Sequence, residues 1–280
     1  MAFAANSLLA RAAIDPGGDG PAIGPVAFTA LRLAAGALVL WPWLRGARAR
    51  AVAPARGTVA SHTRVHLSVL LSVALVAYAL PFALAYVELG AATGALVLFG
   101  AVQITMLSAG RRSGERLGSR GTVGLVAAAA GMAFLLLPGA SAPTPWAAAA
   151  MLIAGVAWGA YSLVGRGVAD PLRSTARAFV WSLPAAALLA AWPGAWQGVT
   201  ATGVALALAS GGLTSGLGYL VWYLVLPSLT RSAASIVQLL VPVVAAFGAV
   251  ALLGEAIDAR LVTASLLVLG GVGLVVLRRR

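Results

Sequence analysis

The amino-acid sequence predicts an all-α polytopic membrane protein with ten transmembrane helices, arranged as two inverted five-helix repeats. Three observations support this fold class: the composition, a succession of apolar runs of membrane-spanning length, and a match between the two halves of the chain. Of the 280 residues, 61% are apolar and 9% are charged, whereas a soluble domain is roughly 45–50% apolar and about 25% charged. This composition excludes a soluble enzyme.

Apolar runs separated by short polar segments predict the helices, because a helix needs about 20 apolar residues to cross the roughly 30 Å hydrocarbon layer. The strands of a membrane barrel would instead alternate polar and apolar residues. Pro, Gly and charged residues fill the separators, as in Asp15–Gly20, Arg111–Arg116 and Asp170–Arg173. The predicted spans, in chain order, are 1–14, 25–44, 66–87, 91–109, 121–138, 145–164, 178–196, 202–226, 232–253 and 259–277.

The first span is the shortest. From Met1 to Ile14 a helix rises about 21 Å at 1.5 Å per residue, so we interpret it as a short or truncated first helix. A cleaved signal peptide is the alternative. It is disfavoured because there is no basic n-region and because Asn6 and Arg11 interrupt the apolar stretch.

The arginines predict the orientation of the helices. The 19 Lys+Arg residues are all arginine, and against 7 Asp+Glu they give a formal net charge of +12. They concentrate in alternate loops and in the C-terminal tail, which by the positive-inside rule face the cytoplasm together with both termini. The charge thus indicates multi-pass topology in a cytoplasmic membrane. A nucleic-acid partner is not expected, because it would require a basic face on a folded domain.

An internal repeat divides the chain into residues 1–139 and 140–280. Because each half holds five helices, the second half enters the membrane from the opposite face, so the repeats are inverted. Inverted repeats with a site near the midplane are the physical basis of alternating access. The matching segments, in order, are Ala5–Arg11 with Ala160–Arg166, Ala85–Tyr86 with Trp222–Tyr223, and Ser113–Glu115 with Leu253–Glu255.

These motifs resemble EamA-type transporters of the drug/metabolite transporter superfamily. The likeness covers essentially the whole chain and includes the paired runs ending in Arg11 and Arg166, the Gly-Glu pairs after the fourth and ninth helices, and the Ser232–Pro242 stretch. The first helix departs from the family pattern, with Ala4-Ala5 where Trp-Gly is common. The resemblance implies export or exchange of small metabolites, amino acids or drugs, with helices 1, 3, 4, 6, 8 and 9 around a central cavity.

Polar and aromatic side chains inside these helices predict the substrate pathway, because such groups are costly when they face lipid. Stacking on the rings would favour aromatic or apolar-cationic substrates. For the two glutamines a plain interhelical hydrogen bond is an equal alternative, and for Trp222 and Tyr223 an interfacial belt is favoured. The predicted pathway residues are Asn6, Tyr78, Gln103, Trp158, Tyr161, Tyr219 and Gln238, with Ser7, Thr105, Ser162, Thr214, Ser215 and Ser235 as further candidates.

Arg32 lies seven residues inside the second helix, where an unpaired guanidinium costs several kcal/mol. One interpretation is a contact for an anionic substrate group, which would make the chain an exchanger of anionic metabolites. The interpretation we favour is a structural link to a carbonyl or a carboxylate. Arg11, near a helix end, needs only to snorkel. Pro81 and Pro242 are predicted hinges, because each removes a backbone hydrogen bond from its helix.

The residues that the sequence lacks also limit the function. The chain has no cysteine, places His62 and His66 in one polar stretch, and carries no Asp or Glu in the middle of any predicted span. We therefore expect no catalytic residue, no metal site and no cofactor, which makes a membrane-embedded enzyme the least favoured alternative. A facilitative exporter is favoured over one driven through an embedded carboxylate. The expected partners are a small-molecule substrate and membrane lipids, and the chain is either a monomer or a homodimer.

Overall fold

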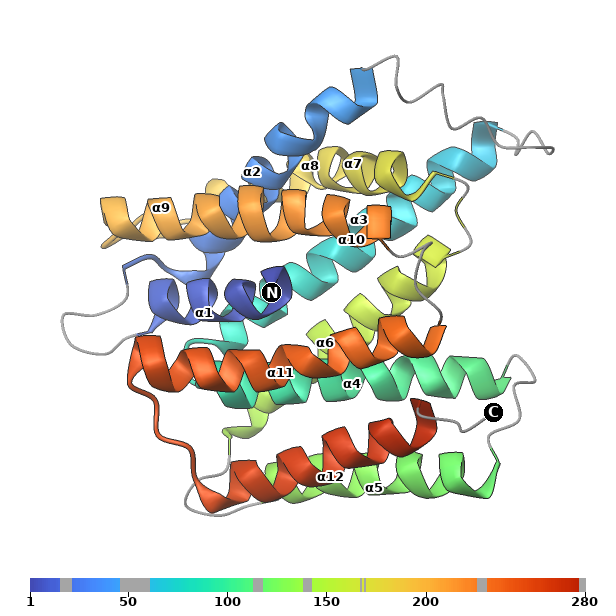
Figure 1. The fold of residues 1–280 in the computed structure, drawn as a ribbon. Coiled ribbons are helices and arrows are strands. Elements are labelled where there is room, and N and C mark those ends of the chain that lie inside the picture. Colours follow the sequence, from blue (N-terminus) through green and yellow to red (C-terminus); the bar gives the residue numbers. More distant parts are fainter. Residues whose placement is uncertain are drawn as a thin grey trace.

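The computed structural model describes residues 1–15, 22–45, 61–112, 118–137, 143–166, 168, 170–225 and 231–276. These residues form helices joined by short connections (Figure 1). The basic stretches 46–60, 113–117 and 277–280, on which the predicted orientation depends, lie outside the described residues.

The helices of the first half follow the predicted spans closely. In the described part of the chain, six helices are long and apolar enough to cross a membrane. Four of these six belong to the first half. The first helix is short, as predicted, with 13 residues. The helices are α1 (Ala2–Ile14), α2 (Pro25–Arg45), α3 (Ser61–Ala85), α4 (Ala91–Arg112) and α5 (Ser119–Leu136).

The second half begins with α6 (Pro145–Arg166), and the next predicted span differs in both bounds and continuity. Its helix starts at Pro171 rather than 178, because the Asp170 side chain accepts a hydrogen bond from the Arg173 amide at 3.0 Å and caps the first turn. It then breaks at Ser182 into α7 (Pro171–Trp181) and α8 (Leu183–Ala190), where Pro184 sits in the first turn of the new helix.

The predicted end of this span at 196 is wrong. Helix α8 stops at Ala190, and turns follow in which Gly194 and Gly198 have φ of 77° and 67°. A glycine tolerates such angles without steric cost, so these two residues turn the chain after the helix has ended, and Pro193, which has no amide hydrogen, does not extend it.

The eighth span contains an unusual central stretch. Helix α9 (Ala201–Ala209) continues into a π-helix, η2 (Ser210–Leu217), and then into α10 (Gly218–Val225). A Cβ on Gly211 would lie 2.3 Å from the Arg32 carbonyl oxygen, so the glycine allows α2 to approach the π-helix backbone. π-Helical turns are rare in proteins, and many of those that do occur lie at functional sites.

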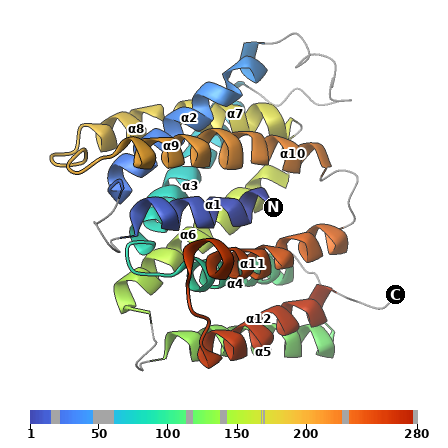
Figure 2. The same ribbon diagram turned by 60° about the vertical axis from the view of Figure 1, so that its left-hand side comes forward.

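Two further helices, α11 (Arg231–Leu253) and α12 (Ala259–Val276), complete the fold. The helices lie roughly side by side in successive layers (Figures 1 and 2). Helices α2 and α7 to α10 form one end of the stack, α5 and α12 pair at the other end, and α1, α3, α4, α6 and α11 lie between them. The candidate functional site lies where the group of α2 and α7 to α10 meets α1, α3 and α6 of the middle layers.

Candidate functional site

The centre of the bundle holds a buried hydrogen-bond network organised by Asn6 of α1. Its Nδ2 donates to the Tyr78 hydroxyl at 3.2 Å. Its Oδ1 accepts from the hydroxyls of Ser210 at 2.7 Å and Thr214 at 3.1 Å, both on the π-helix. A single amide thereby connects α3 with η2 across the predicted boundary between the two halves.

Arg32 of α2 joins the same network and has an exposed fraction of 2%. Its Nη2 donates to the Tyr78 hydroxyl at 2.9 Å and its Nε donates to Ser215 Oγ at 3.1 Å. The guanidinium also lies over the rings of Tyr78 and Phe82, with its Cζ 4.9 Å from each centroid. Its partners are therefore hydroxyls and rings, not the carbonyl or carboxylate that the sequence favoured.

The third nitrogen of the Arg32 guanidinium, Nη1, differs from the other two. It is buried and makes no hydrogen bond of normal geometry with the described residues, although the Tyr219 hydroxyl lies close enough to interact with the guanidinium. No carboxylate of the described residues lies within ion-pair distance of the Arg32 guanidinium. The ion pairs of Asp15 and Glu255 are made with Arg11 instead. A buried full charge beside neutral partners is costly to maintain.

Aromatic side chains form the other half of this site. Trp158 stacks on Tyr161 with ring centroids 5.3 Å apart and planes 8° apart. It also contacts Tyr219 at 4.8 Å and Tyr78 at 5.2 Å between centroids. Four of the predicted pathway residues therefore touch one another, and Tyr78 belongs to both the polar network and the aromatic group.

We call the combined group the central cluster. It draws on α1, α2, α3, α6, η2 and α10, which brings together elements of both halves. Its members are Phe3, Asn6, Arg32, Tyr78, Trp158, Tyr161, Ser210, Thr214, Ser215 and Tyr219.

Phe3 is a member that the sequence reasoning missed. Its ring lies 5.8 Å from both Trp158 and Tyr219 and 5.9 Å from Trp222, so it joins three aromatic residues of the second half. The signal was available, because Phe3 lies three residues before Asn6 and therefore on the same face of α1. Trp222 packs on this ring at the edge of the cluster.

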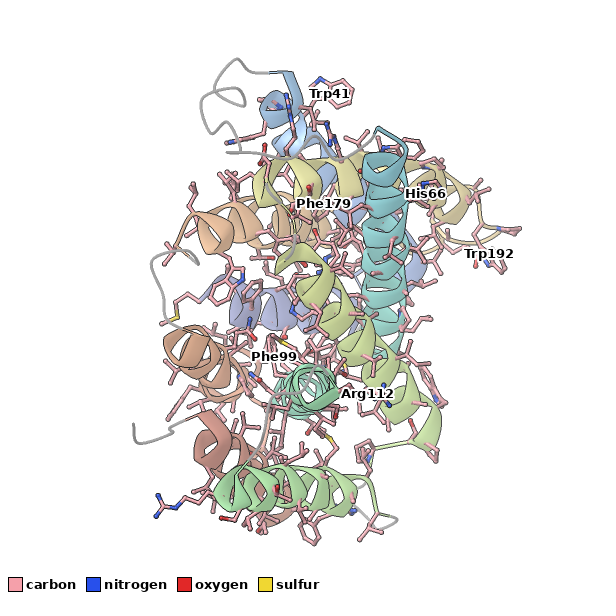
Figure 3. All side chains as sticks on the ribbon, turned by 90° about the vertical axis from the view of Figure 1, so that its right-hand side faces the viewer. Trp41, His66, Phe99, Arg112, Phe179 and Trp192 are labelled. Atoms are coloured by element: carbon pink, nitrogen blue, oxygen red, sulfur yellow. The ribbon has the colours of Figure 1, made fainter. Side chains whose placement is uncertain are left out.

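The surrounding phenylalanines were also not predicted. Phe99 of α4 lies 6.5 Å from Phe3, and Phe179 of α7 lies 5.8 Å from Tyr219. Figure 3 shows both of them between the helices, whereas Trp192 projects at the edge of the molecule. Exposed tryptophans of this kind are typical of the membrane–water interface.

The predicted glutamines do not join the hydrogen bonds of the central cluster within the described residues. Gln103 and Gln238 are both buried. Gln103 lies one turn beyond Phe99 on α4, and its Nε2 has no hydrogen-bond partner in the described part of the chain. The interhelical hydrogen bond weighed for this residue is thus not made by its amide nitrogen.

The predicted hinge prolines lie inside continuous helices, Pro81 in α3 and Pro242 in α11. Pro81 follows Tyr78 by three residues and so lies beside the central cluster on the same helix. Pro242 instead lines an apolar groove of about 540 Å³ with Leu96, Phe247 and Leu261. The two prolines therefore occupy different surroundings.

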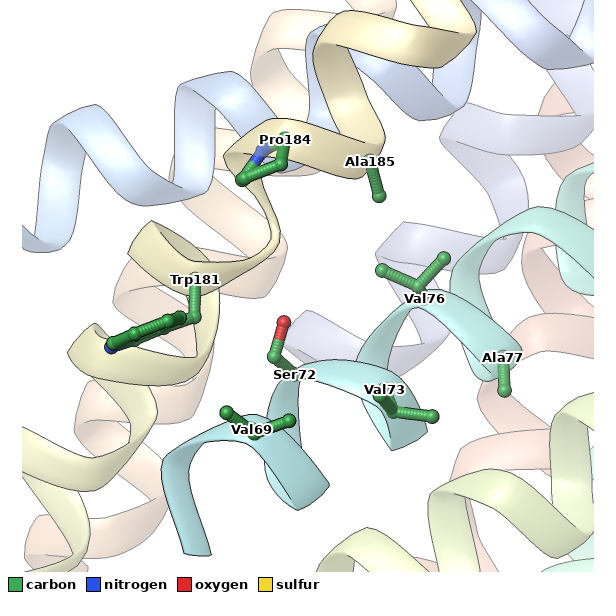
Figure 4. Close-up of a pocket in the computed structure, with 8 residues that line it drawn as sticks. All are labelled: Val69, Ser72, Val73, Val76, Ala77, Trp181, Pro184 and Ala185. Carbon is green, nitrogen blue, oxygen red and sulfur yellow. The ribbon is translucent and has the colours of Figure 1, made fainter. Parts of the chain in front are cut away.

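A second apolar cleft, of about 420 Å³, opens where α7 breaks into α8 (Figure 4). Val69, Ser72 and Val76 of α3 line one side, and Trp181 and Pro184 line the other. Ser182 at the break donates from its hydroxyl to the Phe179 carbonyl at 2.7 Å. The break therefore leaves a lateral opening in an apolar surface.

One end of the bundle carries a network of charges around Arg11. This side chain does more than snorkel, because it lies 3.1 Å from Asp15 and 3.5 Å from Glu255 and donates to the Tyr86 carbonyl at 3.0 Å. Glu255 also accepts from the Ala91 amide at 2.7 Å, at the N-terminus of α4. The α11–α12 connection is thereby fixed to α1 and α4, which meet at this end in Figure 1.

Comparisons with known proteins bear on this arrangement. A model of the EamA-like transporter family matches residues 145–277. An uncharacterized protein of Pseudomonas aeruginosa is 49% identical over 280 residues, which is 100% of this chain and 92% of the relative. A solved crystal structure shares the fold at 21% identity with a TM-score of 0.63, covering 98% of this chain and 94% of the other.

Proposed function

The chain belongs to the EamA-like transporter family, and from this premise we propose that it exports small organic solutes by alternating access through the central cluster. The solutes are metabolites, amino acids or drugs, and the membrane is the cytoplasmic membrane with both chain termini on the cytoplasmic side. Membership of the family agrees with the resemblance found in the sequence and supports a multi-pass membrane transporter.

The single observation that carries the proposal is the position and chemistry of the central cluster. Polar groups of Asn6, Arg32 and Ser215 lie buried beside Trp158 and Tyr161 inside a bundle whose outer surface is apolar. Such groups are costly within a membrane unless they serve a pathway or pair with one another. A convergent set of polar groups among aromatic side chains is typical of a small-molecule site.

The packing of the helices supports two inverted repeats, residues 1–139 and 140–280. If each helix of the first half corresponds to one of the second, contacts should occur in exchanged pairs. Helix α3 packs on α6 while α9 and η2 pack on α1, and α4 packs on α6 while α11 packs on α1. Likewise α2 packs on η2 and α3 on α7, and the pairs α4–α11, α5–α12 and α2–α8 join corresponding helices.

The cluster itself follows the same correspondence. The sequence match aligns Tyr86 with Tyr223, an offset of 137 residues, and this offset also relates Tyr78 to Ser215. Both of these hydroxyls accept a hydrogen bond from Arg32. Arg32 is thus held by corresponding residues of the two repeats. This arrangement is expected of a substrate site at the interface between inverted repeats.

The Arg11 network supports an alternating mechanism because it joins the halves at one end of the pathway. Arg11 belongs to the first half and Glu255 to the second, and their ion pair at 3.5 Å holds the two halves together at that end. When the halves rock to open this end, the ion pair must break. A transporter of this type moves between two packings of similar energy.

The test is transport by the full chain reconstituted into liposomes, against a panel of amino acids, organic acids and drugs, with and without a pH gradient. Trp158→Ala should abolish transport of the solute identified, because it removes the centre of the aromatic group. Trp192→Ala, a surface tryptophan, is the matched control and should leave transport intact. Transport that survives Trp158→Ala, or that requires a pH gradient, would contradict the pathway or the facilitative mode respectively.

Exchange of anionic metabolites is the second candidate function, favoured by the absence of a carboxylate beside Arg32 among the described residues. Exchange differs from export in that uptake of labelled solute depends on unlabelled solute on the other side. A counterflow experiment in the same liposomes separates the two modes.

A further inference from the structure

The chemistry around Arg32 points to a specific substrate class, and we propose that the central cluster binds an organic anion with a carboxylate and a flat apolar group. The carboxylate is held by Arg32, and the apolar group lies against Trp158 and Tyr161. This inference rests on the proposed function. It also replaces the cationic class that the aromatic side chains alone had favoured.

The first step of the argument is charge. Arg32 is buried, and the described carboxylates lie elsewhere, at the ends of helices or in connections, as Asp15, Glu88 and Glu255 do. The hydroxyls of Tyr78 and Ser215 satisfy two guanidinium nitrogens but neutralise no charge. A bound anion would supply the missing charge, whereas a bound cation would add repulsion.

The second step is donor geometry. Arg32 Nη1 makes no hydrogen bond of normal geometry with the described residues, although the Tyr219 hydroxyl is close, and Nη2 donates to a single hydroxyl, so both nitrogens of the guanidinium edge can donate to a ligand. Arginine uses this planar edge to hold both oxygens of a carboxylate. The site thus matches a carboxylate better than it matches a neutral carbonyl, which offers one acceptor atom.

The third step is the position of the aromatic rings. Tyr78 contacts both the guanidinium and the Trp158 ring: Arg32 Cζ lies 4.9 Å from the Tyr78 centroid and the Trp158 centroid lies 5.2 Å from it. Trp158 in turn stacks in parallel on Tyr161, so the aromatic group extends away from the guanidinium. A ligand with a ring close to its carboxylate spans both parts, because offset stacking places rings within about 4.5–7 Å.

Access to the site follows from the proposed mechanism. Arg32 and Trp158 are both buried in the described conformation, so the ligand reaches them when the halves part at one end. The hydroxyls of Tyr78 and Ser215 hold the guanidinium in place while the site is empty.

The experiment compares three probes of one shape: naphthoate, naphthamide and naphthylmethylammonium. Binding of the radiolabelled probes to the purified full chain in detergent is measured by scintillation proximity, with protein-free micelles as background. The chain should bind naphthoate at least about tenfold more tightly than the amide, because a charged pair is stronger than a neutral one, and should bind the ammonium most weakly. Equal or tighter binding of the amide or the ammonium overturns the inference without any variant.

Variants then assign the preference to Arg32. Arg32→Gln should make naphthoate and naphthamide bind within about threefold of each other, and Arg32→Lys should retain part of the preference because it keeps the charge. Arg260→Gln is the matched control. Arg260 also lies over a ring, that of Phe134, and donates to carbonyls, but it is outside the cluster, so the preference should persist. An anion preference that survives both Arg32 variants in folded protein contradicts the proposal.

The outcomes separate this inference from the proposed function. If the chain binds naphthoate through Arg32 but moves no solute in liposomes, the result supports the binding site and contradicts the transport role. If the chain transports a neutral or cationic solute and Trp158→Ala abolishes that transport, the result supports the transport role and contradicts the anion site.

Discussion

Arg11 and Glu255 are 244 positions apart in the sequence, yet Arg11 Nε lies 3.5 Å from Glu255 Oε1. The same carboxylate accepts hydrogen bonds from the Ala91 and Ala92 amides at the start of α4. Gly90 makes this possible, because a Cβ there would lie 2.7 Å from the carboxylate. The contact thus combines an ion pair with a negative charge at a helix N-terminus, where it is favourable.

Removing the charge of Glu255 should weaken closure of that end. Glu255→Gln is expected to cost about 1–3 kcal/mol of unfolding free energy, because the ion pair with Arg11 is lost and the α4 amides then donate to a neutral oxygen instead of a charged one. The chain has no cysteine, so Ser7→Cys provides a single label site beside the central cluster on α1. A membrane-impermeant maleimide, added on the side of the membrane where Glu255 lies, should label this cysteine faster when Glu255→Gln is also present. An unchanged labelling rate would mean that the contact is purely structural.

Asn6 should be the most sensitive polar residue of the pathway. Asn6→Leu leaves the hydroxyls of Ser210, Thr214 and Tyr78 without their amide partner, which we expect to cost about 1–3 kcal/mol and to abolish transport. Thermal unfolding and liposome transport measure the two effects. The matched control is Thr29→Val, because Thr29 is equally buried but donates only to Pro25 of its own helix. A larger loss in the control would contradict the special role of Asn6.

Gly211 should tolerate no side chain. A Cβ would meet the Arg32 carbonyl oxygen at 2.3 Å and the Arg32 Cα at 2.8 Å, and backbone atoms cannot move aside as a side chain can. Gly211→Ala should therefore destabilise the protein by about 1–3 kcal/mol and displace Arg32, reducing transport. Gly270→Ala is the control, since nothing lies within 4 Å of its Cβ. It should raise stability by about 0.5–1 kcal/mol through helix propensity.

Pro242 provides a test of the hinge prediction. Pro242→Ala allows a backbone hydrogen bond to the Gln238 carbonyl, which should stabilise α11 by about 1–3 kcal/mol. If this proline is a hinge, the transport rate falls while probe affinity stays the same. Pro81→Ala is the parallel variant beside the central cluster. A gain in stability with an unchanged transport rate in both variants would show that neither proline acts as a hinge.

The composition and periodicity of the chain predicted most of the fold. Long apolar runs leave a helix as the only structure that satisfies its own backbone in lipid, so the predicted spans agree with the helices to within a few residues in most cases. The exceptions depend on local chemistry. The Asp170 cap extends α7 toward the N-terminus, and turns that contain Gly194 and Gly198 replace the last residues of the same span.

The sequence also predicted residue types for the site better than it predicted their contacts. Asn6, Tyr78, Trp158, Tyr161 and Tyr219 lie together, because polar and aromatic groups within apolar helices avoid lipid and gather together. Their role as a substrate pathway stays a prediction. Gln103 and Gln238 were predicted by the same rule but lie outside the cluster's hydrogen bonds in the described part of the chain. Burial alone does not decide which side chain faces which.

By itself the sequence determined that this chain is a helical membrane protein with a small set of buried polar and aromatic groups, because solvation in lipid restricts both the backbone and the placement of such side chains. Only the tertiary structure decided that Arg32 is held by the hydroxyls of Tyr78 and Ser215, and that Arg11 is paired with Glu255. Those contacts join residues more than forty positions apart. They depend on helix rotation and packing distance, which no local pattern encodes.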